Sequence, residues 1–228
     1  MNSILAILAV CYVTYTFDDG LKDQYTHAYP MLKEAGLKGT FFVIAGKVGD
    51  PNGYRSKAER NTPLMTWDDI KEMCDAGMEI GSHSFSDIRI AKLTHDEIVS
   101  DLKRSKETIE AHTGKPCVSF AAPFNAKESK MDGTKSQDAA REAGMPYVRL
   151  KQKGAGGAAT ADSLNALVEA QKRKGGWIVF MTHGMTRGYD AWQDLEEFRK
   201  HLEWVKNQPD VKVGTFAEIS KIMEDENK

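Results

Sequence analysis

Short β-prone runs alternate with helix-forming stretches along the whole chain. Apolar and β-branched runs such as 40–44 and 177–182 are followed, directly or after a loop, by a helical pattern. About seven of these strand-then-helix units succeed one another at a uniform period, and no low-complexity linker divides them. The alternation predicts one α/β domain over residues 1–228, a distorted (β/α)7 barrel that is TIM-barrel-like, with helices around a parallel sheet.

Capping residues, glycines and prolines set the boundaries of these elements. The strands expected are 7–17, 40–44, 78–82, 117–121, 147–150, 177–182 and 211–213. The helices expected are 24–35 with a kink at Pro30, 66–77, 94–113, a helix ending at 143, a helix ending at 175 that Asp162 or Ser163 caps, 195–207, and a last helix from 215. Residues 154–157 are expected to form a loop, without the spacing of a phosphate-binding motif.

Composition limits the partners. With 228 residues, 41% of them hydrophobic, and a net charge of -2, the chain can bury a substantial core and has no charge-driven attraction to nucleic acid. The three cysteines are too few and too scattered for a disulfide framework, so we expect small buried thiols. Beyond the N-terminus no apolar run could span a bilayer, and we expect no transmembrane segment.

Residues 1–13 allow two interpretations. They are apolar enough for an export signal, but they lack a positively charged start. Cleavage at their end would also remove the strand that presents Asp18. We therefore favour a first β-strand here over a signal peptide.

Polar and charged residues follow four of the predicted strands. Asp18 and Asp19 follow the first strand, His83 the third, residues 123–124 the fourth and His183 the sixth. In a β/α barrel the carboxyl ends of the strands share one face, so these residues are expected to meet there. Of two adjacent carboxylates, one can hold a divalent cation while its neighbour takes a proton. The pattern therefore predicts a functional site at this end of the barrel.

These motifs resemble those of the polysaccharide deacetylases of carbohydrate esterase family four. Residues 16–20, T-F-D-D-G, match the family's first motif, and residues 179–183 match its fifth, an aliphatic-x-Leu-x-His pattern. His83 begins a match to the second motif, H-[S/T]-x-x-H, in which Asp87 stands in place of the second histidine. The resemblance extends over nearly the whole chain.

The resemblance implies a metal-dependent deacetylase. Asp18 would be the general base and His183 the general acid. Asp19, His83 and Asp87 would hold a divalent metal, for which Zn²⁺ is the expected ion and Mn²⁺, Co²⁺ or Ni²⁺ are alternatives. Asp87 could also act through a water molecule or be an acid of a surface loop. As a direct ligand it would add a negative charge and weaken the metal as a Lewis acid.

The chain departs from the family at the third motif, which usually supplies an arginine that orients the base. Ala121 stands in that place. Without a cationic partner, the pKa of Asp18 is expected to be higher than in members of the family. Arg149 could supply some of the missing function, or it could form a salt bridge at a strand edge.

Five residues are expected to contact the substrate. A backbone N–H near Phe124, after Pro123, would bind the oxyanion. Met181 points to the same side of its strand as the catalytic histidine and could line the pocket for the acetyl methyl group. Tyr189 and Trp192 follow in a loop at the same face, where they could stack on a sugar ring.

The leading hypothesis is a hydrolase that removes N-acetyl groups from an amino-sugar polysaccharide or oligosaccharide, such as chitin-like or peptidoglycan glycan. An O-acetyl esterase acting on acetylated xylan could use the same site, because an alkoxide leaves more easily than an amine. A glycan-binding protein with decayed catalysis is a third reading, based on the lost histidine and arginine. The resemblance implies an exported or envelope protein, whereas the N-terminus leaves a cytoplasmic location open; the oligomeric state has no signal in the sequence.

Overall fold

The computed structural model describes residues 10–51, 62–87, 89, 93–124, 134–188 and 190–226. Its strands form one sheet in the order β5-β4-β3-β2-β1-β7-β6, and each assigned pair of strands is parallel. β8 lies off this path and pairs with the first half of β1, whose second half pairs with β2. The strands are β1 (Cys11–Phe17), β2 (Thr40–Val43), β3 (Glu79–Ser82), β4 (Ser119–Ala121), β5 (Tyr147–Arg149), β6 (Lys153–Gly154), β7 (Gly176–Thr182) and β8 (Val211–Val213).

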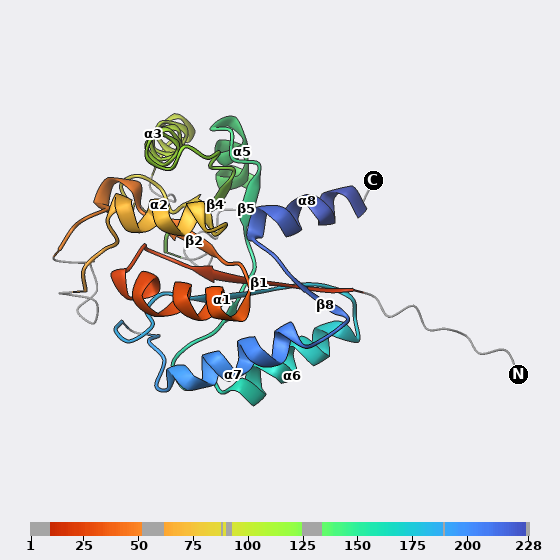
Figure 1. The fold of residues 1–228 in the computed structure, drawn as a ribbon. Helices are drawn as coiled ribbons and strands as arrows, with labels where there is room; N and C mark the ends of the chain where they lie inside the picture. The colour runs from red at the N-terminus through yellow and green to blue at the C-terminus, as the bar shows by residue number, and fades with distance from the viewer. Residues whose placement is uncertain are drawn as a thin grey trace, which may run out of the picture.

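Helices lie along the outside of this curled sheet (Figure 1), which confirms the predicted barrel-like α/β fold. α2 and α3 lie on one side of β1, and α6 and α7 lie on the other. The helices are α1 (Tyr29–Ala35), α2 (Trp67–Asp75), α3 (His95–Thr113), α5 (Thr134–Glu142), α6 (Ala161–Lys172), α7 (Leu195–Lys206) and α8 (Phe216–Glu226). Two short turns complete the described elements, the π-helical η1 (Gln24–Ala28) and the 3₁₀ turn η2 (Ala45–Lys47).

Local signals explain most boundaries, with three differences from expectation. The predicted capping boxes at Thr66 and Thr94 are both present. The cap of α6 was predicted wrongly: it is Thr160, and Ser163 is the residue whose side chain bonds back to it. The stretch around Pro30 is divided into η1 and α1, with the proline in the first turn of α1, where its missing N–H costs nothing. Gly154, expected as the first residue of a loop, forms the strand β6 together with Lys153.

The alternation of β1 decides what faces the inside of the barrel. Its odd-numbered residues, Cys11 to Phe17, belong to the large core between sheet and helices. Thr14 and Thr16 have the opposite parity and are also buried. A second, small apolar cluster of Phe42, Ala121, Val179 and Phe216 is separate from that core. Asp18 continues the parity of the two threonines, so the strand directs it toward the barrel interior.

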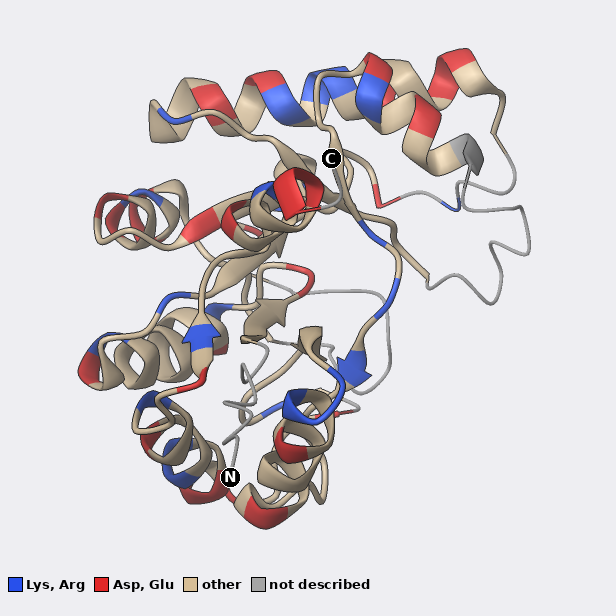
Figure 2. Ribbon diagram, turned by 90° about the vertical axis from the view of Figure 1, so that its right-hand side faces the viewer, with Lys and Arg blue, Asp and Glu red and all other residues tan. Residues whose placement is uncertain are grey.

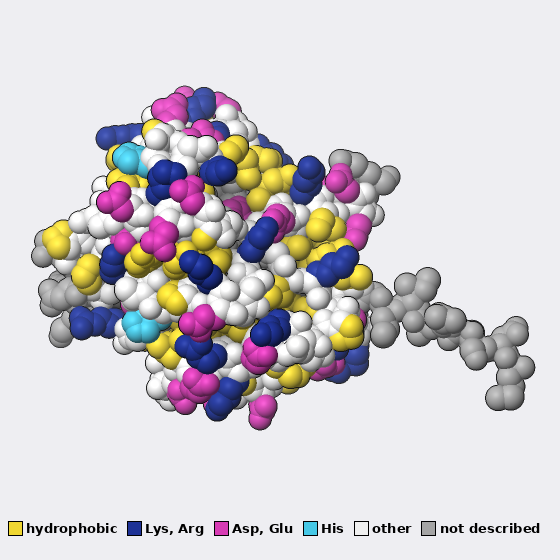
Figure 3. Space-filling view, viewed as in Figure 1, with side chains coloured by type: hydrophobic (Ala, Val, Ile, Leu, Met, Phe, Trp, Pro, Cys, Tyr) yellow, Lys and Arg dark blue, Asp and Glu magenta, His cyan; other side chains and the backbone are white. Residues whose placement is uncertain are grey.

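The surface carries both signs of charge. Acidic and basic residues are interspersed along the helices (Figure 2) and over the face seen in Figure 3. This mixture agrees with the net charge of -2. The three cysteines are buried free thiols, as expected. Among the described residues, no helix combines the length and the apolar character that crossing a membrane requires.

Candidate active site

Four of the predicted residues lie just beyond the carboxyl ends of strands. Asp18 and Asp19 follow β1, His83 follows β3 and His183 follows β7. The backbone N–H of Asp18 donates to the carbonyl of Thr182 at 3.1 Å, so the pairing of β1 with β7 continues into the site. All four side chains are buried. The structure therefore brings these residues together at one end of the sheet.

Arg149, the last residue of β5, binds both carboxylate oxygens of Asp18. Its Nη1 donates to Oδ1 at 2.6 Å and its Nη2 to Oδ2 at 2.5 Å. Nη1 also donates to the hydroxyl of Thr16 at 2.9 Å, which fixes the guanidinium plane. In the register of β4 and β5, Arg149 is the partner of Ala121. An arginine on the neighbouring strand, at the same level, thus supplies the cation that the third motif lacks.

This ion pair gives Asp18 the cationic partner that it was expected to lack. Burial alone would raise the pKa of the carboxyl group, but the charge and the hydrogen bonds of Arg149 outweigh it and lower the pKa to about 2. The expectation that Asp18 lacks a cationic partner was wrong because it considered only position 121. Of the two roles left open for Arg149, the structure supports the pairing with Asp18. Bidentate geometry also fixes the orientation of the carboxylate.

His183 is held by an acid that sequence reasoning missed. Its Nδ1 lies 2.8 Å from Oδ2 of Asp190, which also accepts the backbone N–H of His183 at 3.0 Å. Burial would lower the pKa of His183, but the bond to Asp190 and the charges of Asp18 and Asp19 raise it to about 9. His183 is therefore an imidazolium at neutral pH. The available signal was an acid seven residues after a strand-end histidine.

Asp19 and His83 form a second buried pair. Nε2 of His83 lies 3.3 Å from Oδ1 of Asp19, and Nδ1 lies 2.8 Å from the carbonyl oxygen of Ala121. A carbonyl only accepts hydrogen bonds, so Nδ1 carries the proton and Nε2 faces the carboxylate. Burial would lower the pKa of His83, but the bond to Asp19 and the charge of Asp18 raise it. A histidine fixed through Nδ1 in this way is oriented as metal-binding histidines are.

Asp87 is buried beyond the same strand, next to a lysine. Its Oδ2 lies 3.9 Å from Nζ of Lys47, and its backbone N–H donates to the hydroxyl of Ser84 at 2.8 Å. Within the described ranges, no three His, Cys, Asp or Glu side chains gather closely enough to hold one metal ion. Two of the three predicted ligands, an oxygen of Asp19 and a nitrogen of His83, are therefore close enough to hold one metal ion. The predicted third ligand, Asp87, is not gathered with them.

Backbone strain is concentrated at this end of the barrel. Among the described residues, four non-glycine residues have a left-handed φ: Asp19 (73°), Ser84 (68°), Asp87 (56°) and Phe124 (65°). Each follows a strand that ends at the site. Conformations of this kind cost about 1–3 kcal/mol each and persist where the surrounding structure enforces them, often at functional sites. The strained positions therefore mark the same site as the buried charges.

The model of a family described as polysaccharide deacetylase matches residues 10–148, a span that includes Asp18, Asp19 and His83. The chain belongs to the polysaccharide deacetylase family. The Bacillus subtilis protein YxkH is 33% identical over 98 residues, which are 43% of this chain and 31% of YxkH. The poly-β-1,6-N-acetyl-D-glucosamine N-deacetylase of Staphylococcus aureus is 26% identical over 121 residues, 49% of this chain and 40% of that enzyme. These matches span less than half the length of either relative.

Solved structures share the fold of this chain over almost its whole length. A candidate polysaccharide deacetylase of Mycobacterium smegmatis covers 96% of this chain and 92% of its own, with a TM-score of 0.72 and 17% identity. The peptidoglycan deacetylase PdaC of Bacillus subtilis covers 97% and 94%, with a TM-score of 0.61 and 15% identity. A family 4 acetyl xylan esterase of Clostridium thermocellum, solved with a cobalt ion, covers 93% and 92%, with a TM-score of 0.57 and 19% identity.

The structure places the predicted substrate-contacting residues in different surroundings. Pro123 is buried, and Phe124 is half-buried with the guanidinium of Arg89 4.6 Å from its ring centre. Met181 is the register partner of Thr16, so it lies on the face of the sheet that carries Thr16. Tyr189 lies outside the described residues.

Trp192 is not placed as predicted. It is only 6% exposed, and its ring packs 5.1 Å from that of Phe198 of α7, within the core between sheet and helices. A ring buried in this way has no face available to a sugar. The prediction that Trp192 stacks on the substrate is therefore corrected: the loop after β7 folds its tryptophan inward beneath α7.

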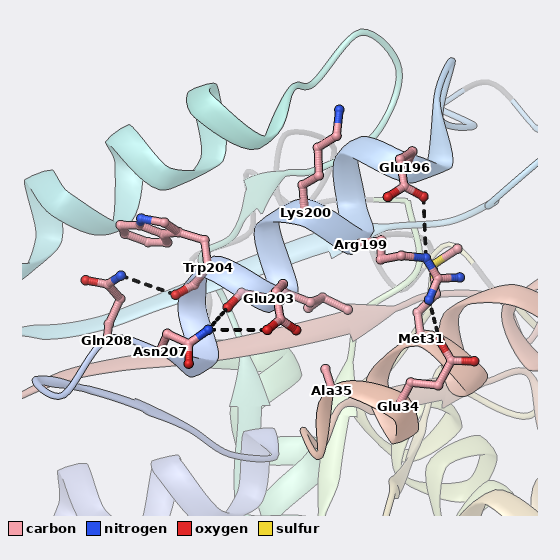
Figure 4. A pocket seen from close by; sticks show the side chains of 11 residues that line it. Met31, Glu34, Ala35, Glu196, Arg199, Lys200, Glu203, Trp204, Asn207 and Gln208 are labelled. Atoms are coloured by element: carbon pink, nitrogen blue, oxygen red, sulfur yellow. Dashed lines mark hydrogen bonds and ion pairs between the residues drawn. The ribbon is translucent and has the colours of Figure 1, made fainter.

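A groove of about 610 Å³ lies elsewhere, between α1 and α7 on the outside of the barrel (Figure 4). Arg199 crosses it and pairs with Glu34 and Glu196. Asn207 and Gln208 bond to groups of their own helix end. None of the residues of the candidate active site lines this groove.

Proposed function

We propose that the chain is a metal-dependent hydrolase that removes N-acetyl groups from an amino-sugar polysaccharide or oligosaccharide. One observation carries this proposal: two titratable groups of one site are driven to opposite protonation states. Arg149 keeps Asp18 ionised, and Asp190 keeps His183 protonated. A carboxylate that accepts a proton beside an imidazolium that donates one is the pair that amide hydrolysis needs.

The proton path follows from the hydrogen bonds. Nδ1 of His183 is bonded to Asp190, so Nε2 carries the proton that can pass to the nitrogen of the departing amine. An amine leaves poorly without that proton, which gives the imidazolium its role. Asp18 accepts the proton of the attacking water, and Arg149 keeps its carboxylate turned into the site.

A carboxylate with a pKa of about 2 is a weak base, so Asp18 can act only on a water that is already acidified. A divalent metal supplies that acidification when bound, and it polarises the acetyl carbonyl. Asp19 and His83 would hold it, with Asp87 as a third ligand directly or through water. We expect Zn²⁺, with Mn²⁺, Co²⁺ or Ni²⁺ as alternatives. The cobalt ion in the Clostridium thermocellum esterase supports a divalent metal.

The relatives support an amino-sugar glycan as substrate. The Staphylococcus aureus relative is named for poly-β-1,6-N-acetyl-D-glucosamine, and PdaC for peptidoglycan. Such substrates support an exported or envelope location for this chain. A backbone N–H near Phe124, after Pro123, would bind the oxyanion. Met181 would line the acetyl pocket, and Tyr189 would contact the sugar.

Acetate release tests this function. After treatment with a chelator and addition of one divalent ion at a time, the protein is offered chito-oligosaccharide, peptidoglycan glycan, poly-β-1,6-N-acetyl-D-glucosamine and acetylated xylan. We expect release from an N-acetylated substrate, and a loss of about 100-fold or more in Asp18→Asn. Asp75→Asn removes an exposed, paired acid and is the control that keeps activity. Acetate release that survived Asp18→Asn would contradict the proposal.

Two other functions are distinguished by the same assay. Preference for acetylated xylan would indicate the O-acetyl esterase, a reading favoured by the fold shared with the Clostridium thermocellum enzyme. Glycan binding without acetate release under any metal would indicate decayed catalysis. The observation that favours this last reading is the contact between Lys47 and Asp87, which places a cation beside the proposed third ligand.

A further inference from the structure

Gln24 joins the two loops that carry the proposed base and acid. Its Nε2 donates to the backbone carbonyl of Asp18 at 2.5 Å and to that of His183 at 2.7 Å. The side chain has no exposed surface. Gln24 is the first residue of the π-helical turn η1, an irregular element that is often found at functional sites. One buried amide thus joins the carbonyls of Asp18 and of His183, the latter 159 positions after Gln24 in sequence.

Packing alone does not account for this glutamine. Both carbonyls only accept hydrogen bonds, so the amide must turn Nε2 toward them. Its Oε1 then lies buried, without a hydrogen-bond partner in the described part of the chain. A buried acceptor left in this way is destabilising, whereas an apolar side chain of similar size would avoid that cost. What Gln24 provides is therefore its two donated hydrogen bonds.

The preceding residue, Asp23, holds the loop that follows His183. Its Oδ2 accepts the backbone N–H groups of Met185 and Thr186, both at 2.8 Å, and that of Arg187 at 3.3 Å. Three successive N–H groups around one carboxylate oxygen form an anion-binding nest that fixes the loop backbone. Two adjacent residues therefore hold the loop after β7: Gln24 bonds the carbonyl of His183, and Asp23 bonds the N–H groups of residues 185–187.

We propose that Asp23 and Gln24 are positioning residues for the deacetylase reaction. Gln24 sets the separation of the backbones of Asp18 and His183, and Asp23 anchors the loop behind His183. This inference rests on the proposed function for its effect on rate. The claim that these hydrogen bonds fix the loop backbones does not rest on that function, because it can be tested without substrate. A displacement of about 1 Å between reacting groups can reduce the rate by about 100-fold.

The first test replaces Gln24 by methionine, which has a similar shape and no donor. We expect kcat to fall by about 10- to 100-fold while KM stays within about twofold, because the substrate contacts are unchanged. Gln24→Glu should lose more, since it places carboxylate oxygens against two carbonyls. Gln171→Met is the matched control: Nε2 of Gln171 also donates to a backbone carbonyl, that of Gly175 at the end of α6. An equal loss of kcat in Gln171→Met would overturn the inference.

The second test measures amide hydrogen exchange in the absence of substrate. We expect faster exchange at Asp18 in Gln24→Met, and at Met185 and Thr186 in the milder variant Asp23→Asn. Unchanged exchange at these amides, with kcat within twofold of wild type, would make both residues ordinary packing groups and sink the inference. If the wild type released no acetate while these amides still responded, the proposed function would fail and the positioning contacts would stand.

Discussion

Arg149 donates two hydrogen bonds to the carboxylate of Asp18, from Nη1 to Oδ1 at 2.6 Å and from Nη2 to Oδ2 at 2.5 Å, although the two residues are 131 positions apart in the chain. Both side chains are almost completely buried. Removing one partner of a buried ion pair leaves the other charge uncompensated, which is far more destabilising than losing an exposed pair. This contact therefore matters for the fold as well as for the proposed reaction.

Arg149→Met should destabilise the protein by about 3–5 kcal/mol near neutral pH. The folded-state pKa of Asp18, about 2, lies below its ordinary value of 3.8. The ion pair therefore contributes its full stability above pH 3.8, and this contribution is lost as the pH falls toward 2. The stability gap between wild type and Arg149→Met should therefore narrow on acidification. Denaturant unfolding between pH 2 and 7 measures it. Arg141→Met, at an exposed arginine, is the control, and a gap independent of pH would contradict the assignment.

Asp190→Asn should lower the pKa of His183. In the wild type this pKa is about 9, above the ordinary 6.5, so the imidazolium persists to that pH and is lost as the pH rises through it. The basic limb of the pH profile of kcat/KM should therefore move to lower pH in Asp190→Asn. Stability linked to His183 has the same sign: it is complete below about 6.5 and is lost as the pH rises through about 9. Asp194→Asn, which alters only the cap of α7, should leave the limb in place.

The sequence could predict where the chemistry gathers but not what supports it. Asp18, Asp19, His83 and His183 each follow a strand, and barrel topology alone brings strand ends together. For Arg149 the sequence left two roles open, because its role depends on the register that sets it beside Ala121. Register across two short strands is not written in a periodic pattern, because each strand offers only three residues.

Side-chain directions in loops were harder to predict than those in strands, because loops have no periodic pattern. Asp190 and Trp192 are two residues apart after β7, yet one turns toward His183 and the other into the core. Hydrophobic periodicity distinguishes faces within a helix or strand, and a loop has none. The aromatic residue predicted to be exposed therefore proved to be buried, and the supporting acid escaped notice.

Trp192→Ala should reduce stability rather than substrate affinity. The ring is buried against Phe198, and truncating a buried tryptophan costs about 3–5 kcal/mol. Well below the melting temperature of the variant, KM for a glycan from which the wild type releases acetate should stay within about twofold of the wild-type value. Thermal unfolding and steady-state kinetics on one preparation separate the two effects. A raised KM with unchanged stability would restore Trp192 as a sugar-binding residue.

Lys47→Met should tighten metal binding, if Asp87 is the third ligand as proposed. Nζ of Lys47 lies 3.9 Å from Oδ2 of Asp87, so the ammonium group competes with a cation for that carboxylate and repels it. Removing one such charge should increase Zn²⁺ affinity roughly tenfold, measured by competition with a chromophoric chelator. Lys71→Met, at an exposed lysine paired with Asp75, should not change the affinity. Unchanged or weaker binding in Lys47→Met would mean that Asp87 and Lys47 form a purely structural pair, and that Asp19 and His83 hold the ion without them.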